Sequence, residues 1–155
     1  MRGTSTVLVL AFLGGLTSGC HEDTPEAAVR RVLDEGVAAI HARDLERAAR
    51  HLSPAYRDRF GNTATEIRQL AFALLWRGPV YVVLRDTKIE VDGATARVTM
   101  TAYAVQGQPE LRKLSDLIPR DAERFELTLT FALEDGRWRL RAVDGEGLDV
   151  PAWGG

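Results

Sequence analysis

The spacing of apolar residues changes from a helical period to a period of two at Gly78-Pro79. Upstream of this dipeptide, apolar side chains recur three and four residues apart, as on one face of an α-helix. Downstream they alternate with polar side chains, as on a half-buried β-strand. Helices followed by strands are typical of an α+β fold. Because 155 residues suffice for one domain of ordinary size, we expect a single α+β domain.

Three helices are predicted in the first half of the chain. Thr24-Pro25-Glu26 has the form of an N-cap, a first-turn proline and a first-turn acid, and it begins a helix that runs to about residue 42. Asp44 caps a short second helix. A capping box at Thr63-x-x-Glu66 begins a third, which ends near Trp76 and is apolar around most of its circumference. We therefore expect the third helix to be buried.

A glycine interrupts the first of these helices. Gly36 costs about 1 kcal/mol relative to alanine at a helical position. Its presence predicts that a neighbouring element packs closely against the helix at this point.

Four strands are predicted after Gly78-Pro79. Asp92-Gly93 and Asp135-Gly136 are hairpin-turn signals, so they separate the first strand from the second and the third from the fourth. A change of parity across Arg85-Asp86 indicates a β-bulge in the first strand. Each strand has one largely apolar face, so one face of the sheet is expected to be core and the other solvated.

Residues 1–19 have the layout of an exported signal peptide. Arg2 supplies a positive start, and the apolar run from Val7 to Leu16 is shorter than the roughly 20 residues that a spanning helix needs. Small residues then precede Cys20, which is the only cysteine in the chain. We expect residues 1–19 to be removed.

The residues before this cysteine resemble the lipobox of bacterial lipoproteins. In that family the thiol receives a diacylglycerol, the peptide is cut before the cysteine and the new N-terminus is acylated, which implies lipidation of Cys20. Leu16, Ser18 and Gly19 fit the pattern, whereas Thr17 stands where the family usually has an aliphatic residue. The alternative is an ordinary secretory peptide whose single cysteine is incidental.

The lipoprotein resemblance implies a location in the bacterial cell envelope. Residues 20–23 would form the lipidated cysteine and a tether of roughly 13 Å, which holds the domain to the membrane through its lipid. His21 is not the aspartate associated with retention at an inner membrane, so the resemblance favours the outer membrane of a two-membrane cell, with the domain facing the periplasm. The chain carries 20 Lys+Arg against 22 Asp+Glu, so nucleic acid is not an expected partner.

Residues 24–145 resemble the NTF2-like (cystatin-like) superfamily. The likeness is carried by the amphipathic first helix, the stretch from Ile40 to Ala49, the aromatic-bearing third helix and a closing strand with Asp135-Gly136-Arg137-Trp138. It implies N-terminal helices packed in the concave face of a curved antiparallel sheet of about four strands. It implies no single function, because the same cone hosts isomerases, dehydratases, cyclases, transport factors and domains without known activity. Residues 146–155 would form a C-terminal tail.

No titratable side chain stands at an inward strand position, so a catalytic acid or base would have to come from the helical half. The available groups are His41, Asp44, His51 and Tyr56. Simpler interpretations exist, since Asp44 caps a helix, His41 lies at a polar helix edge and His51 ends a helix. The two histidines also lack the spacing of metal ligands. We therefore predict no catalytic residues, no metal and no cofactor.

The sequence indicates which side chains would line an apolar cavity inside the cone. The predicted lining residues are Tyr56, Trp76, Val98, Met100, Phe125, Leu127 and Trp138, with the tyrosine as the polar contact. The same side chains could equally form plain core. The stretch from Gln106 to Arg120 is longer than a hairpin needs, and its Leu111, Leu114 and Leu117 form either a lid over the cone or a connector that packs on the sheet edge.

The sequence thus predicts a lipid-anchored envelope protein with a non-catalytic NTF2-like domain, which binds a small apolar ligand or an envelope protein. The alternative is a small-molecule isomerase or cyclase that uses His41, Asp44 or Tyr56 as acid or base. The outer sheet face is polar, with side chains such as Arg97 and Thr128, so we expect a monomer or a weak dimer.

Overall fold

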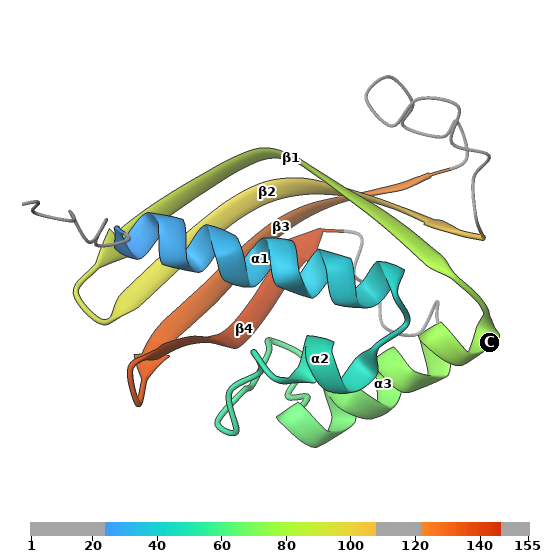
Figure 1. Ribbon diagram of the computed structural model, residues 1–155, viewed down its shortest axis with the longest axis horizontal. Coiled ribbons are helices and arrows are strands. Elements are labelled where there is room, and N and C mark those ends of the chain that lie inside the picture. Colours follow the sequence, from blue (N-terminus) through green and yellow to red (C-terminus); the bar gives the residue numbers. More distant parts are fainter. Residues whose placement is uncertain (1–23, 108–121, 147–155) are drawn as a thin grey trace, which may run out of the picture.

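The computed structural model describes residues 24–107 and 122–146 (Figure 1). The helices are α1 (Pro25–His41), α2 (Leu45–Ala49) and α3 (Ala64–Arg77), and the strands are β1 (Val80–Asp92), β2 (Thr95–Gln106), β3 (Glu123–Glu134) and β4 (Arg137–Glu146). The predicted lipidation site Cys20 and the leucines Leu111, Leu114 and Leu117 lie outside the described residues. Within the described ranges, no helix is long and apolar enough to cross a membrane.

The predicted start of the first helix is confirmed. Pro25 occupies the first turn of α1, and the side-chain oxygen of Thr24 accepts a hydrogen bond from the backbone N–H of Ala27 at 3.2 Å. This cap satisfies one of the backbone donors that every helix start leaves free. The buried side chains of α1 are Val29, Leu33 and Ala39, which fixes the face that the helix turns to the sheet.

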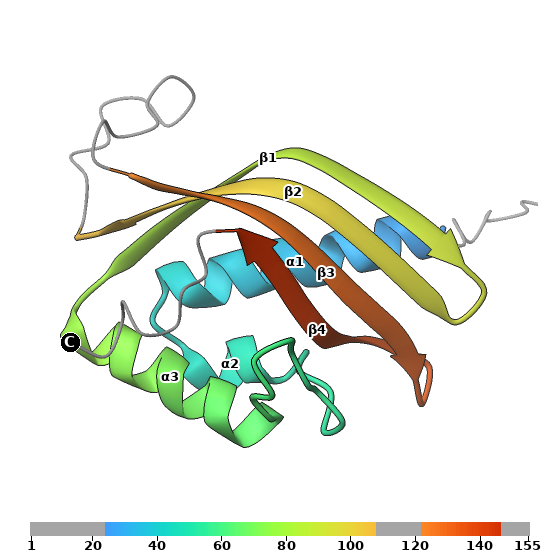
Figure 2. The same cartoon turned by 180° about the vertical axis from the view of Figure 1, so that it is seen from behind.

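The four strands form one antiparallel sheet in the order β1-β2-β3-β4, and the sheet curves around α1 (Figures 1 and 2). The predicted bulge is confirmed, because the register between β1 and β2 shifts between Arg85 and Lys88. Asp86 adopts a left-handed conformation there, with a φ of 52°. A bulge of this kind bends a strand locally. The curved antiparallel sheet with the helices on its concave face confirms the predicted α+β class.

The core lies between α1 and the concave side of the sheet. Val29 and Leu33 of α1 meet the inward side chains of β2, β3 and β4. The strand members of this cluster are Ala96, Val98, Met100, Leu129, Phe131 and Trp138. Burying these apolar surfaces stabilises the fold by roughly 25 cal/mol per Å² removed from water.

The free edge of β4 is covered by the loop that follows α2. The backbone N–H of Ser53 donates to the carbonyl oxygen of Leu140 at 2.9 Å, and the N–H of Leu140 donates to the carbonyl of His51 at 2.7 Å. Further along, the N–H of Arg57 donates to the carbonyl of Arg141 at 3.0 Å. Residues 51–57 therefore extend the sheet beyond β4 and hold this loop against it.

The expectation that the third helix is buried is wrong. The Arg43 guanidinium holds the end of α3 by donating to the carbonyl oxygen of Leu75 at 2.6 Å and 3.1 Å, but the helix stands away from the sheet over most of its length (Figures 1 and 2). Leu75 is its one buried side chain, whereas Phe72 and Trp76 are 54% and 76% exposed. Apolar composition indicated burial, but the pattern says nothing about whether another element covers the outer face.

Candidate functional site

An apolar cavity of about 380 Å³ lies between the helices and the concave face of the sheet. All three helices and all four strands contribute to its wall. The helical side includes Val37, Ile40 and Ala71, and the sheet side includes Met100 and Leu127. Because nearly every side chain of this wall ends in carbon, the cavity suits an apolar occupant.

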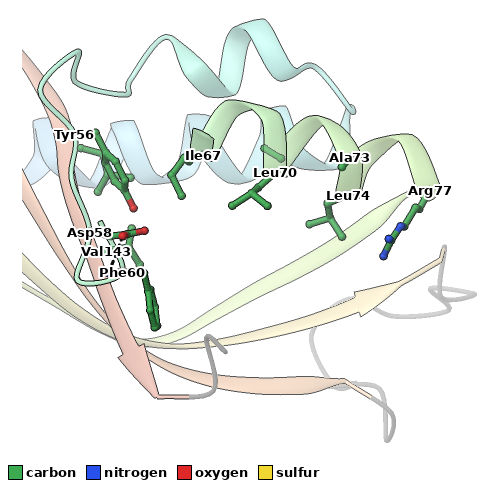
Figure 3. Close-up of a pocket in the computed structure, with 11 residues that line it drawn as sticks. Tyr56, Asp58, Phe60, Ile67, Leu70, Ala73, Leu74, Arg77 and Val143 are labelled. Carbon is green, nitrogen blue, oxygen red and sulfur yellow. Dashed lines mark hydrogen bonds between the residues drawn. The ribbon is translucent and has the colours of Figure 1, made fainter. Parts of the chain in front are cut away.

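A second cavity, of about 270 Å³, adjoins the first along α3 (Figure 3). Tyr56, Asp58 and Phe60 line one end of this cavity, and Arg77, the last residue of α3, lines its opposite end. The side chains that line both cavities are Ile67, Ala71, Leu74 and Leu140. The two spaces therefore adjoin along these aliphatic side chains, and the smaller one has polar side chains at its rim.

The close packing predicted at Gly36 is contradicted. A Cβ added at this glycine would meet no atom within 4 Å, and Gly36 lines the larger cavity. The missing side chain therefore contributes to open volume rather than to a tight contact. Ala48, Ala49 and Ala71 also present small side chains to this space.

The structure disperses the side chains that were predicted to line one pocket. Met100 and Leu127 line the larger cavity, and Tyr56 lines the smaller one. Val98, Phe125 and Trp138 are buried in the domain but line neither of these two cavities. Trp76 is exposed on the outer side of α3 and lines neither cavity. A shared strand face thus correctly indicates the inward direction, but it does not indicate where the helices leave space.

His41 and Asp44 both have structural contacts. The Nε2 of His41 lies 3.0 Å from both the backbone nitrogen and the carbonyl oxygen of Val82, and the ring stacks on Tyr81 with centroids 4.8 Å apart. The imidazole thus covers part of the free edge of β1. Asp44 accepts a hydrogen bond from the N–H of Arg47 at 2.9 Å, which confirms its predicted role as the N-cap of α2.

His51 is the titratable side chain that the fold brings to the larger cavity together with a carboxylate. Its ring lines the cavity, and its Nε2 lies 2.9 Å from Oε2 of Glu35. Within the described residues the buried Nε2 has no hydrogen-bond partner, and its contact with Glu35 is ionic when the ring is protonated. The sequence indicated only that His51 ends a helix. It gave no sign that Glu35 of α1 lies beside the ring.

Tyr56 is a neutral phenol in this setting. Burial, followed by the negative charge of Asp58, raises the pKa of Tyr56 above its ordinary value. The hydroxyl lies beside the Asp58 carboxylate at one end of the smaller cavity (Figure 3). The side chain is 3% exposed and the hydroxyl donates its proton to Asp58, so it does not serve as a base near neutral pH.

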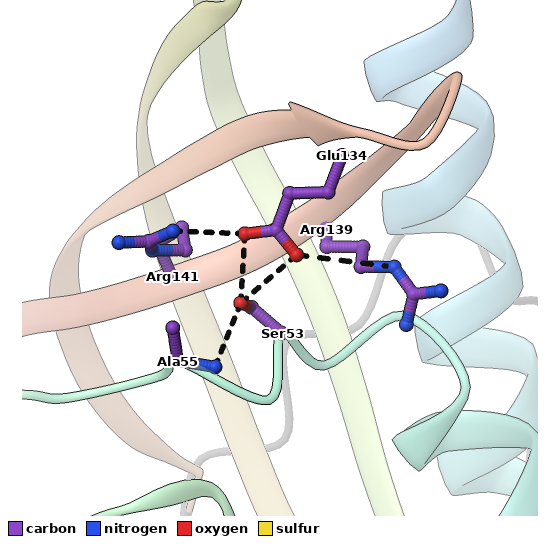
Figure 4. A network of polar contacts seen from close by, with 5 residues as sticks. All are labelled: Ser53, Ala55, Glu134, Arg139 and Arg141. Carbon is purple, nitrogen blue, oxygen red and sulfur yellow. Dashed lines mark hydrogen bonds and ion pairs between the residues drawn. The ribbon is translucent and has the colours of Figure 1, made fainter.

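A polar network fixes the loop that carries Tyr56 (Figure 4). The hydroxyl of the fully buried Ser53 donates to the Glu134 carboxylate, with oxygen distances of 2.8 Å and 3.1 Å, and accepts from the N–H of Ala55 at 3.1 Å. Arg141 donates to the same carboxylate at 2.9 Å, and Arg139 lies 4.0 Å from it. Hydrogen bonding by Arg141 and then by Ser53 holds the pKa of Glu134 below its ordinary value.

Replacing Ser53 by alanine should lower the free energy of unfolding by about 1.5 kcal/mol at neutral pH, because a buried hydrogen bond to a charged group is lost. Because the folded-state pKa of Glu134 is lowered, its stabilising contribution is present above about pH 4 and is lost as the pH falls through the folded value. The difference from the wild type should therefore shrink in acid. Urea denaturation at several pH values measures it, with Thr95→Ala, at an exposed hydroxyl, as the control. Equal losses for the two variants would contradict the role of the network.

Comparisons with known proteins identify the fold. No protein-family model matches the sequence, and no curated protein matches it. Among solved structures, an NTF2-like protein of unknown function from Pseudomonas putida superposes with a TM-score of 0.62 at 12% identity, covering 77% of this chain and 84% of that chain. The fold is NTF2-like.

Two further structures share this NTF2-like arrangement. A protein of unknown function with a cystatin-like fold from Nostoc punctiforme has a TM-score of 0.58 at 13% identity, covering 79% of this chain and 92% of that chain. A protein from Streptomyces avermitilis, whose name proposes a dehydratase of the NTF2-like family, has a TM-score of 0.61 at 18% identity and covers 76% and 92%. At these identities the likeness concerns the fold alone.

Proposed function

We propose that the protein binds a small apolar molecule in the larger cavity and does so without catalysing a reaction. The observation that carries this proposal is the cavity of about 380 Å³ between α1, α3 and the concave sheet face. Small side chains at Gly36, Ala48 and Ala71 keep this volume open, and aliphatic side chains surround it. Transfer of an apolar ligand from water into such a space is favourable in proportion to the apolar area that it buries.

The surroundings of the acid and base candidates support a binding role. His41 is engaged with the backbone of β1, and Asp44 with the backbone of α2. Tyr56 keeps its proton because burial and Asp58 raise its pKa. Each of these three side chains therefore already performs a structural task or lacks the charge state of a general base.

One observation favours the alternative of an isomerase- or cyclase-like enzyme. His51 lines the cavity, and the carboxylate of Glu35 lies 2.9 Å from its Nε2. A carboxylate that lies beside an imidazole can stabilise its protonated form during proton transfer. If this alternative holds, His51→Ala would lose turnover of a bound small molecule while retaining its binding, whereas a binding module has no turnover to lose.

We propose further that the domain is held at the bacterial envelope by a lipid on Cys20. Only four residues separate Cys20 from Pro25, where α1 begins, so an acylated cysteine would hold the domain near the bilayer. With this attachment the domain would face the periplasm. In a cell that has two membranes, the lipid would anchor it to the outer one. Its partners would be the membrane itself and a small apolar ligand or an envelope protein.

Native mass spectrometry tests these proposals. A form that starts at His21 contains every helix and strand of the fold, so it should be purified from a bacterial periplasm and measured directly. We expect a monomer that carries a persistent small-mass adduct, because the cavity would retain an apolar molecule from the cell. A clean monomer in repeated preparations would contradict ligand binding and direct attention to the outer surface. The full chain should gain the mass of acyl groups, and its Cys20→Ala variant should not.

A further inference from the structure

Exposed large apolar side chains occur mainly on α3 and in the loop before it. Phe60, Leu70, Phe72 and Trp76 are between 39% and 76% exposed, and they lie on α3 or in the loop that precedes it. Within the described residues, the one other exposed large apolar side chain is Leu133 at the end of β3. Phe60 and Leu70 line the smaller cavity, whereas Phe72 and Trp76 stand on the outer side of α3, where exposed apolar surface marks a candidate site of interaction.

The outer face of α3 combines two aromatic rings with two arginines. Phe72 and Trp76 are one turn apart, with ring centroids 5.8 Å from each other. At about 100° per residue, Arg68 lies about 40° from Phe72 on one side of the pair and also lines the larger cavity, whereas Arg77 lies about 100° from Trp76 on the other side and also lines the smaller cavity. We call these four residues the outer α3 face. Its centre is apolar and each of its borders carries a positive charge.

No described residue compensates the charges of the outer α3 face. Neither Arg68 nor Arg77 forms an ion pair with any residue of the described ranges. The single acidic residue of α3, Glu66, is engaged in the capping box, where it accepts from the backbone N–H of Thr63 at 2.6 Å. Among the residues that the structure describes, the face therefore has no anionic counterpart, and an outside partner can supply one.

We propose that the outer α3 face docks on an anionic lipid bilayer, with α3 lying in the plane of the membrane interface. Phe72 and Trp76 enter the region between headgroups and acyl chains, where amphipathic rings are favoured. Arg68 and Arg77 reach the lipid phosphates on either side. A helix of 14 residues is about 21 Å long, which is too short to span the hydrocarbon layer but suits attachment along its surface.

Charge favours a bilayer over a second copy of the chain as the occupant of this face. A two-fold contact through α3 presents the same residues from both partners. The two copies would bring four arginines together without a free carboxylate from either α3. An anionic membrane surface supplies those negative charges.

Vesicle binding of the form that starts at His21 tests this proposal without an N-terminal lipid. We expect co-sedimentation with vesicles that mix phosphatidylglycerol into phosphatidylcholine, and weaker binding to phosphatidylcholine alone. The double variant Phe72→Ser, Trp76→Ser should bind at least tenfold more weakly, because the apolar insertion is removed. Each of Arg68→Gln and Arg77→Gln should weaken binding to the anionic vesicles roughly fivefold.

Leu133→Ser is the matched control, because it removes an exposed apolar side chain away from the outer α3 face. It should bind as the wild type does, and circular dichroism should show that every variant is folded. Absence of wild-type binding, or equal binding by the double variant, would overturn the proposal. So would a dimer in sedimentation that the double variant abolishes while vesicles bind neither protein. Ligand binding in the cavity is measured without vesicles, so the two proposals fail independently.

Discussion

Replacing Ala71 by tryptophan is expected to weaken strongly the binding of an uncharged apolar fluorophore, N-phenyl-1-naphthylamine, in the cavity. Ala71 lies on the inward side of α3, and its methyl group lines both cavities. An indole at this position would occupy the space between α3 and the sheet. If the probe loses about 100 Å² of apolar contact, at about 25 cal/mol per Å², the loss is roughly 2.5 kcal/mol, close to a seventyfold weaker affinity.

Gln69→Trp is the control for this substitution. Gln69 is on the exposed side of the same helix, two residues away, so the added indole points to solvent and should leave the cavity unchanged. Fluorescence titration compares the two variants with the wild type, and the Phe72→Ser, Trp76→Ser variant excludes probe bound to the outer α3 face. Unchanged affinity in Ala71→Trp would place the probe elsewhere and would count against the proposed binding site.

The local structure of this chain could be predicted because it depends on short-range chemistry. Thr24, Asp44 and Thr63 cap helices as expected, because each puts a side-chain oxygen or a capping box next to free backbone N–H groups. The parity change at Arg85-Asp86 indicated a bulge because side chains alternate across a strand. These signals lie within a few neighbouring residues.

The larger cavity could not be predicted in the same way, because its volume depends on where α3 stands relative to the sheet. Apolar strand positions indicate which side faces inward, but they do not distinguish side chains under α1, such as Val98, from side chains beside open space, such as Met100. The available signal was the set of small residues at inward helical positions. Gly36 is one of them. Glycine is unfavourable inside a helix, and the open space beside this position fits a role in keeping the cavity open.

The two tryptophans of the predicted lining have opposite environments in the structure. Trp138 belongs to the core cluster and is 7% exposed, whereas Trp76 is 76% exposed. Both follow apolar patterns in the sequence, and both are large enough to dominate a core. What separates them is a long-range fact, namely that Trp138 packs in the core cluster with Val29 and Leu33 of α1, while the described elements leave the outer side of α3 open.

Trp138→Ala is therefore expected to lower the free energy of unfolding by about 3–5 kcal/mol, because it removes a buried indole and leaves a cavity beneath α1. That loss is a large share of the roughly 5–15 kcal/mol that stabilises an ordinary domain, so the variant should be partly unfolded at physiological temperature. Trp76→Ala makes the same chemical change on the surface, and it should alter the unfolding free energy by about 0.5 kcal/mol or less. Urea denaturation followed by circular dichroism compares the two. Similar losses in both variants would show that another part of the chain covers α3 in solution, and this would also remove the basis for its docking on a membrane.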